Sequence, residues 1–371
     1  MNVFRIIIKI VRIIVLSIIG VLLIGVIIVA VNSSGRLEPL KDSEGNEIAG
    51  SLVEKNWVEI GGIRQGYFIR AEDPNNPVIL FLHGGPGGPA LPFQINREVS
   101  ERLEKYFTVV YWEQRGAGIS FSASIDHPAT MTLDQLVEDT RQMTEYLQRR
   151  FGQERIFLMG LSWGSYLGIK TIERYPENYL AYIGIGQVTN QIESDRLAYD
   201  FMLQHAMEIN DRRATKDLQR FDRDAPEFPS LSYIVSVRTP LMNKYGIGMA
   251  RNENLNDFRL GLEVLFFEGY TFIEKINYFR GLSFSNLHLW DNSKKGNLFE
   301  SSISFEIPVF IIHGKWDYMV SYTLAREWFD KIDAPEKAFF SFENSAHSPF
   351  MEEPEKFVQI IRSIALLNDP P

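Results

Sequence analysis

Short runs of apolar residues recur along most of the chain and predict its strands. The runs cover residues 78–82, 108–112, 156–159, 182–185 and 309–312. Because they lack polar alternation, they indicate strands buried on both faces, as in a parallel sheet covered by helices. Between the runs, apolar residues return every three or four positions, from Leu133 to Leu147 and again from Pro354 to Leu366. This helical spacing, alternating with strands, predicts a doubly wound α/β sheet.

Two segments depart from this alternation. Residues 57–60 and 67–69 have strand character and flank Gly61-Gly62, which predicts a hairpin. From 188 to 304 there is no clear buried-strand run, and charged or aromatic-rich helical patterns replace it. We therefore expect a core made of residues 37–187 and 305–371, with residues 188–304 inserted as a mostly helical cap before the last two strands.

The first 36 residues form a third region. Ile13 to Val31 carries no charge and is long enough to cross the hydrocarbon core of a bilayer as a helix. Arg5, Lys9 and Arg12 precede it, so the positive-inside rule predicts a cytoplasmic N-terminus and a body outside. A cleaved signal peptide and a buried helix of a soluble protein are the alternatives. We favour an uncleaved single-pass transmembrane anchor in residues 1–36, followed by a polar linker over residues 32–55.

Composition and charge narrow the possible functions. The chain has 371 residues and a net charge of −9, with no basic stripe, which argues against nucleic-acid binding. It contains no cysteine, which excludes disulfides, a thiolate nucleophile and a cysteine-based zinc site. The histidines are isolated, and no phosphate-binding glycine pattern is present, so we expect neither a metal nor a cofactor.

The sequence Gly160-Leu-Ser-Trp-Gly164 fits the G-x-S-x-G nucleophile elbow. It follows an apolar run and precedes a helical pattern, which is the context that the motif requires. Flanking glycines remove side chains that would collide in so sharp a turn. We expect Ser162 to be the nucleophile and the amide of Trp163 to point at the same space. An ordinary glycine-rich connection between strand and helix is the alternative.

A serine nucleophile needs a base, and the base needs an orienting group. In this type of fold the triad order is Ser, Asp, His. His347 lies in a polar loop before the last helix, and Asp317 is the only acid directly after the strand-like run 309–312. We expect His347 to be the base and Asp317 its partner. Alternatively, each residue caps a helix, and Asp330 and Asp333 are poorer candidates for the acid.

The other five histidines are less suitable as the base. His83 and His127 come too early in the chain, and His205 and His288 lie in the predicted cap. His313 ends a strand.

Acyl transfer also needs two backbone donors that face the developing oxyanion. Besides Trp163, the glycine-rich segment after the run 78–82 can supply one, because glycines let amides approach a substrate without side-chain interference. We expect the second donor to be Gly85, with Gly84 as the alternative. A plain Gly/Pro turn is the competing interpretation.

These residues carry a family resemblance. The chain resembles the α/β-hydrolase superfamily, and most of all its proline iminopeptidase branch, in five motifs: HGGPG at 83–87, WEQRGAGIS at 112–120, GLSWGS at 160–165, HGKWD at 313–317 and SAHSP at 345–349. The resemblance implies that residues 188–304 are the family's helical cap and that Arg115 holds neighbouring loops. Glu113 stands where the family usually has Asp.

Peptidases of this branch hold the substrate's free amino terminus with glutamates of the cap. By this resemblance Glu193 is the first candidate, because it begins the cap close to a strand end. Glu227, Glu263 and Glu268 are others, and each is also explained as a solvated cap residue.

Together these features favour a membrane-anchored serine hydrolase that acts on small peptides or esters. The resemblance implies an aminopeptidase that removes an N-terminal residue, proline among them. An esterase or another amidase would use the same Ser162, His347 and Asp317. A non-catalytic binding module that keeps the fold is a further alternative.

Overall fold

Eight strands form one sheet in the order β1-β2-β4-β3-β5-β6-β7-β8. The computed structural model describes residues 2–91, 102–123, 127–252, 255 and 257–367. The strands are β1 (Leu52–Ile60), β2 (Ile63–Ala71), β3 (Val78–Leu82), β4 (Thr108–Trp112), β5 (Ile156–Leu161), β6 (Tyr179–Ile185), β7 (Val309–Gly314) and β8 (Lys337–Phe342). β1 pairs with β2 as the predicted hairpin and β2 with β4, both antiparallel, whereas β4, β3, β5, β6, β7 and β8 are parallel neighbours. The predicted fold class and strands are confirmed.

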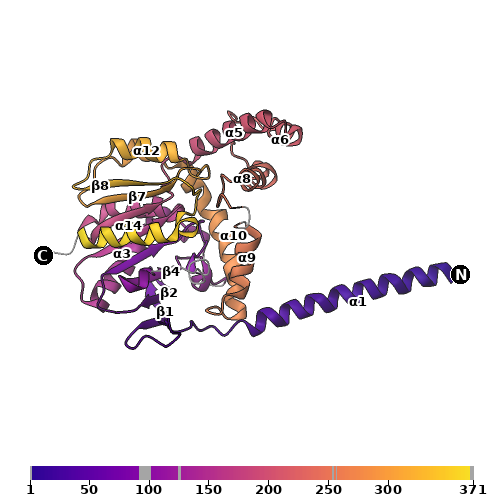
Figure 1. Cartoon of the computed structure of the whole chain (residues 1–371), viewed down its shortest axis with the longest axis horizontal. Helices are drawn as coiled ribbons and strands as arrows, with labels where there is room; N and C mark the ends of the chain where they lie inside the picture. The colour runs from indigo at the N-terminus through magenta and orange to yellow at the C-terminus, as the bar shows by residue number, and fades with distance from the viewer. Residues whose placement is uncertain (1, 92–101, 124–126, 253–254, 256, 368–371) are drawn as a thin grey trace.

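Helices cover both faces of this sheet, as Figure 1 shows. The core helices are α3 (Leu133–Phe151), α4 (Trp163–Arg174), α12 (Tyr322–Lys331), α13 (Pro349–Glu352) and α14 (Pro354–Leu367). Short 3₁₀ turns are η1 (Leu103–Lys105), η2 (Gly118–Ser120), η3 (Pro128–Thr130) and η4 (Pro176–Asn178). They lie in connections between the larger elements.

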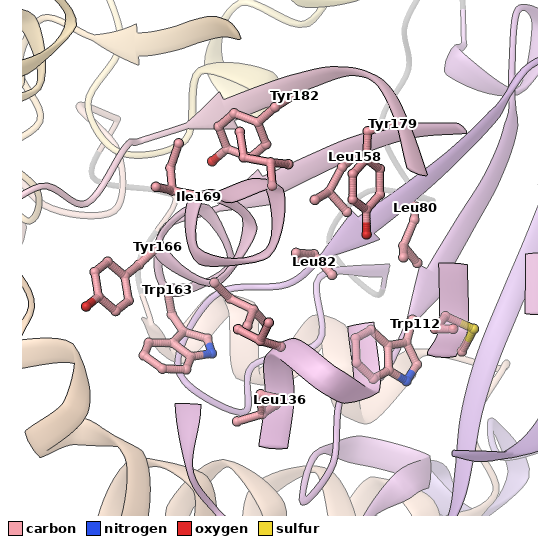
Figure 2. Close-up of a cluster of buried hydrophobic side chains, with 14 of the residues drawn as sticks. Leu80, Leu82, Trp112, Leu136, Leu158, Trp163, Tyr166, Ile169, Tyr179 and Tyr182 are labelled. Carbon is pink, nitrogen blue, oxygen red and sulfur yellow. The ribbon is translucent and has the colours of Figure 1, made fainter. Parts of the chain in front are cut away.

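Alternate residues of β3 enter two separate hydrophobic clusters, because successive side chains of a strand point to opposite faces. Leu80 and Leu82 belong to the cluster that α3, α4 and α12 complete, and Figure 2 shows them with Trp112 and with Trp163 of α4. Phe81 belongs to the other cluster, which includes α14 and part of the cap. β5 is divided in the same way, with Leu158 in the first cluster and Met159 in the second, so the elbow after β5 starts from a strand that is buried on both faces.

The segment between β6 and β7 is helical in its described residues. It contains α5 (Gln191–Glu208), α6 (Arg212–Leu218), α7 (Leu231–Tyr233), the π-helical turn η5 (Ile234–Arg238), α8 (Thr239–Tyr245), α9 (Asp257–Phe266), α10 (Phe272–Lys295) and α11 (Leu298–Ser301). Residues 253, 254 and 256 of the predicted cap lie outside the described residues. α5 to α8 enclose a hydrophobic cluster of their own, which includes Met202 and Tyr233.

The N-terminal helix α1 (Asn2–Val31) runs away from the body, as Figure 1 shows. Its residues 7–31 are long and apolar enough to cross a membrane, and none of this stretch is buried against the body. A signal sequence has the same properties. The polar linker predicted for residues 32–55 is shorter than expected, because β1 already begins at Leu52.

Candidate active site

Ser162 occupies the turn between β5 and α4. Its backbone, with φ 53° and ψ −119°, has a conformation that residues other than glycine rarely adopt. The turn is tight because α4 begins directly at Trp163. A Cβ on Gly164 would lie 2.1 Å from the carbonyl oxygen of Leu82, so only glycine fits there. The structure thus has the strand–turn–helix geometry that the G-x-S-x-G motif predicts, and the strain is localised at the candidate nucleophile.

His347 and Asp317 lie next to each other, although 30 residues separate them in the chain. His347 Nδ1 is 2.7 Å from Asp317 Oδ2, and both side chains are buried. The other carboxylate oxygen, Oδ1, accepts a hydrogen bond from the amide of Val320 at 2.9 Å. Asp317 therefore pairs with the histidine and also accepts a hydrogen bond within the turn before α12, whereas the N-cap of α12 is Ser321 and not, as the alternative expected, Asp317.

A second histidine approaches the same carboxylate. His313 Nε2 lies 3.2 Å from Asp317 Oδ2 and 3.0 Å from the carbonyl oxygen of Val320. Burial on its own would raise the pKa of Asp317, but the neighbouring His347 and His313 outweigh it and hold that pKa well below its usual range. From its sequence position, His313 was expected only to end a strand. Its position at i−4 from Asp317 was the available signal.

The candidate nucleophile and base line one cavity of about 310 Å³. Ser162 and His347 contribute to its wall together with Gly84 and Gly85, the two candidates for the second oxyanion donor. A Cβ on Gly84 would lie 3.2 Å from Ser162 Cβ, so this loop passes directly beside the elbow. The rest of the wall is mainly apolar and comes from several segments: Ala90, Leu161, Met249, Leu260, Val264, Tyr278, Phe279, Leu282, Met319, Phe350 and Met351.

The cap glutamates are placed elsewhere. Glu193 sits in the first turn of α5, where it pairs with Arg196 at 3.4 Å and is partly exposed. Glu193, Glu227, Glu263 and Glu268 are all absent from the described wall of the cavity. The structure therefore does not bring Glu193 to Ser162 as the resemblance implied. None of the described residues that line this cavity carries a carboxylate.

The motif at 112–120 supports the site through the hydrogen bonds of Gln114. The amide of Gln114 donates to His83 Nε2 at 3.1 Å, and its side chain donates to the His83 carbonyl oxygen at 3.1 Å. Its side-chain oxygen also accepts from the indole of Trp163 at 3.3 Å. Gln114 thus links the glycine-rich loop to the elbow. Burial lowers the pKa of His83 to about 4, so this imidazole is neutral and acts as a fixed acceptor.

Arg115 does what the resemblance implied. Its Nε lies 2.8 Å from Asp139 Oδ2 of α3, and its Nη2 donates to the Gly61 carbonyl oxygen at 2.8 Å. This buried pair fastens the β1–β2 turn to α3.

Glu113, the departure from the family pattern, connects the core to the cap. Its carboxyl accepts a hydrogen bond from the amide of Ile119 at 2.6 Å and another from the hydroxyl of Tyr270, which precedes α10. Burial raises the pKa of Glu113 to about 8, although both hydrogen bonds favour ionisation. No sequence pattern had indicated this contact, because it joins residues 157 positions apart.

Known proteins share the fold that carries these residues. A sequence profile described as the alpha/beta hydrolase fold matches residues 77–354. The chain belongs to the α/β-hydrolase family. The hydrolase is 34% identical to a Bacillus subtilis protein named "Probable aminopeptidase YbaC" over 318 residues, which covers 84% of this chain and 96% of the relative. It is 23% identical to a proline iminopeptidase of Clostridioides difficile, with 85% and 99% of the two chains covered.

Solved structures show the same fold. A proline iminopeptidase from Mycobacterium smegmatis superimposes with a TM-score of 0.61 at 16% identity and covers 85% of the hydrolase and 98% of its own chain. An epoxide hydrolase from Bacillus megaterium gives a TM-score of 0.51 at 20% identity, covering 85% and 100%. Because the fold hosts different reactions, the substrate has to be argued from the site.

Proposed function

We propose that the hydrolase is a membrane-anchored serine aminopeptidase that releases N-terminal residues from short peptides through an acyl-enzyme. The observation that carries the proposal is the convergence of Ser162 and His347 on one cavity, with His347 Nδ1 2.7 Å from the buried Asp317. Nucleophile, base and orienting acid are the parts that acyl transfer requires. The two peptidase-named relatives support the choice of peptides as substrates.

In this mechanism Ser162 Oγ attacks the scissile carbonyl carbon while His347 takes the hydroxyl proton through Nε2. Asp317 holds His347 in the tautomer with the proton on Nδ1 and stabilises the imidazolium that forms. When the tetrahedral intermediate collapses, the imidazolium gives its proton to the leaving amine and Ser162 keeps the acyl group. Water, activated by the same histidine, then releases the N-terminal residue and restores Ser162.

Two backbone amides would bind the oxyanion. Trp163 begins α4, so its N–H is one of the first helical donors and has no partner within the helix. Gly85, or Gly84 beside it, supplies the second donor from the loop after β3. The positive end of the α4 dipole adds to this stabilisation.

An esterase or amidase for apolar substrates is the second candidate. It is favoured by the cavity wall, which is mainly apolar and offers no carboxylate from its described residues. For a peptidase, the substrate ammonium would need another partner, and the aromatic rings of Tyr278 and Phe279 in the wall attract cations through their faces. The two candidates therefore differ in whether a free α-amine improves turnover.

The α1 helix is the proposed anchor. Lys9 and Arg12 lie on its N-terminal side, so the N-terminus would stay in the cytoplasm and the catalytic body would lie outside.

The deciding experiment uses the full chain in detergent. It compares the p-nitroanilides of proline and alanine with their N-acetylated forms and with a short p-nitrophenyl ester, and Ser162→Ala is the control. Hydrolysis of the free-amine anilides that is lost on acetylation and in Ser162→Ala supports the aminopeptidase. Equal turnover of the acetylated anilides, or turnover of the ester alone, assigns the site to the second candidate. Activity that survives Ser162→Ala overturns the mechanism.

A further inference from the structure

The cap carries apolar side chains on its outside as well as on its inside. On α10, Ile273 and Ile276 are 62% and 42% exposed, and Phe279 is 38% exposed, which places them along one outward stripe at a spacing of three. On α9, Phe258 and Phe266 are 77% and 47% exposed. We call these five residues the outer apolar face. The three α10 residues follow one another along the helix surface, and neighbouring exposed apolar residues mark an interaction surface rather than ordinary scatter.

The same part of the cap holds the end of α1. The ammonium of Lys275 donates to the carbonyl oxygens of Asn32, just after α1, and of Leu265, near the end of α9. The amide of Gly35 and the hydroxyl of Ser34 both donate to the Glu268 carbonyl oxygen, at 2.9 and 3.0 Å. The candidate anchor therefore meets the body at the turn between α9 and α10, where Figure 1 shows it leaving.

The cavity reaches this face. Phe279 belongs to the cavity wall and is also 38% exposed, so it lies at the mouth. Leu260 and Val264 of α9 and Tyr278 and Leu282 of α10 continue the wall inwards. An apolar path thus leads from the outer apolar face to Ser162.

We infer that the outer apolar face rests on the lipid bilayer and that the active-site cavity opens towards it, so that substrates with an apolar portion enter from the membrane. This inference rests on the proposed function of α1 as an anchor. α1 ends at Val31, and the hydrogen bonds to the cap begin at Asn32. The α9–α10 turn then lies next to the surface of the bilayer from which α1 emerges.

The bilayer fits this face better than a protein partner does, because the exposed Phe266 and Ile273 flank the α9–α10 turn at which α1 meets the cap. Helices that lie in a membrane interface bury one apolar face and keep their polar groups on the other side. On α10 the acid Glu274 follows this pattern, since it turns to Lys55 of β1, with its Oε2 2.6 Å from Nζ, and is mostly buried. Glu274 would therefore keep Lys55 as its partner if the outer apolar face contacted lipid.

Because the chain has no cysteine, single labels can test this directly. Ile273→Cys and Ile276→Cys, each carrying an NBD fluorophore, would be reconstituted as full chains in phosphatidylcholine–phosphatidylglycerol vesicles. Ile303→Cys and Leu366→Cys are matched controls, because these residues are also apolar and exposed (53% and 62%) but lie outside α9 and α10. Doxyl-labelled lipids in the same vesicles report contact with the bilayer.

Labels at Ile273 and Ile276 are expected to be quenched several-fold more than labels at Ile303 and Leu366. Equal quenching at the four positions overturns the inference. Assay of the same vesicles with the soluble proline anilide separates this failure from that of the proposed function: a working enzyme with unquenched cap labels disproves the bilayer contact alone. Failure of the chain to float with the vesicles disproves the anchor and the bilayer contact together.

A kinetic test addresses the route of the substrate. The double variant Ile273→Ser/Ile276→Ser should hydrolyse a proline anilide with a long alkyl chain, dissolved in the vesicles, several-fold more slowly than the unmodified chain does. Its turnover of the soluble proline anilide should not change, because neither residue lines the cavity. The control Ile303→Ser/Leu366→Ser should match the unmodified chain on both. Equal losses on both substrates, or no loss on either, would contradict entry from the membrane.

Discussion

Gly186 lies against the ring of His347, so closely that a Cβ on this glycine would be 2.9 Å from His347 Cε1. Gly186 follows β6 and has φ +54°, a conformation that favours glycine. The same Cβ would be 3.4 Å from Asp317 Oδ2. The backbone at the end of β6 therefore packs directly against His347 and Asp317.

Gly186→Ala should lower kcat strongly, because the methyl group must displace His347 from Asp317. The left-handed backbone adds roughly 1–2 kcal/mol of strain. Gly152→Ala is the matched control, since Gly152 also has positive φ (+67°) but nothing within 4 Å of its Cβ position. Both variants should show lower melting temperatures, whereas only Gly186→Ala should lose activity. Full activity of Gly186→Ala would mean that His347 is not held from this side.

Asp317→Asn should lower kcat by on the order of 10⁴-fold, the effect of removing the orienting charge in serine triads, with a smaller change in KM. Asp330→Asn is the control, because Asp330 is an exposed acid nearby in the chain that pairs with Arg326. Steady-state kinetics on the preferred anilide measures both. If Asp330→Asn lost as much activity as Asp317→Asn, the pairing seen in the structure would not be the working one.

Stability should depend on pH through Asp317. Its pKa in the folded chain lies below that of an ordinary aspartate, about 3.9. The resulting stabilisation is complete above this value and is lost as the pH falls below it. Urea unfolding at pH 6 and pH 3 should therefore show a larger acid-induced loss for the unmodified chain than for Asp317→Asn. Parallel losses would argue against a depressed pKa.

Glu113 should give the opposite pH dependence. Because burial raises its pKa to about 8, the folded chain binds a proton that the unfolded chain, with a pKa of about 4.3, releases. This contribution therefore weakens as the pH rises from about 4.3 to about 8. The Tyr270 hydroxyl can either donate to the carboxylate or accept from the carboxylic acid.

The melting temperature of Glu113→Gln should consequently fall less between pH 6 and pH 9 than that of the unmodified chain. Tyr270→Phe removes the hydroxyl contact and keeps the ring in the core, so it should lower stability without removing the pH dependence. Differential scanning calorimetry at the two pH values measures these shifts. An unchanged slope in Glu113→Gln would assign the pH dependence to other groups.

Lys275→Met should loosen the joint between α1 and the cap, because two carbonyl oxygens lose their ammonium donor. Hydrogen bonds to charged groups contribute roughly 1.5–3 kcal/mol each. Trypsin should then cut faster after Arg36, which is exposed and close to the joint. Lys216→Met, at an exposed lysine of α6, is the control. Equal cleavage rates in the two variants would show that Lys275 does not hold this segment.

The parts of the molecule that the sequence predicted are those that local rules determine. Buried strands such as β3 and β5 consist of uninterrupted apolar residues, and the elbow at Ser162 has glycines where the turn leaves no space. His347 and Asp317 follow from their place in the chain order relative to the strands. For these residues, strand order was enough to predict proximity.

The parts that could not be predicted depend on how the cap packs on the core. The cap helices carry apolar residues on more than one face. The spacing of these residues therefore did not distinguish the buried Tyr278 from the exposed Ile276. Glu193 was chosen for its nearness in sequence to the end of β6, but the direction of α5 carries its side chain to Arg196 instead. Lys275 gave no signal, because its two acceptors are backbone carbonyls of distant segments.

The hydrogen bonds of Lys275 leave little freedom of movement between α1 and the body, because the first cap contact is made by Asn32, the residue directly after Val31. Where α1 spans a bilayer, its tilt is set by the match between its apolar length and the bilayer thickness. A stiff joint passes that tilt on to α10, which also forms one wall of the cavity. If α1 is the membrane anchor proposed above, membrane thickness becomes a physical variable that acts on the shape of the active site.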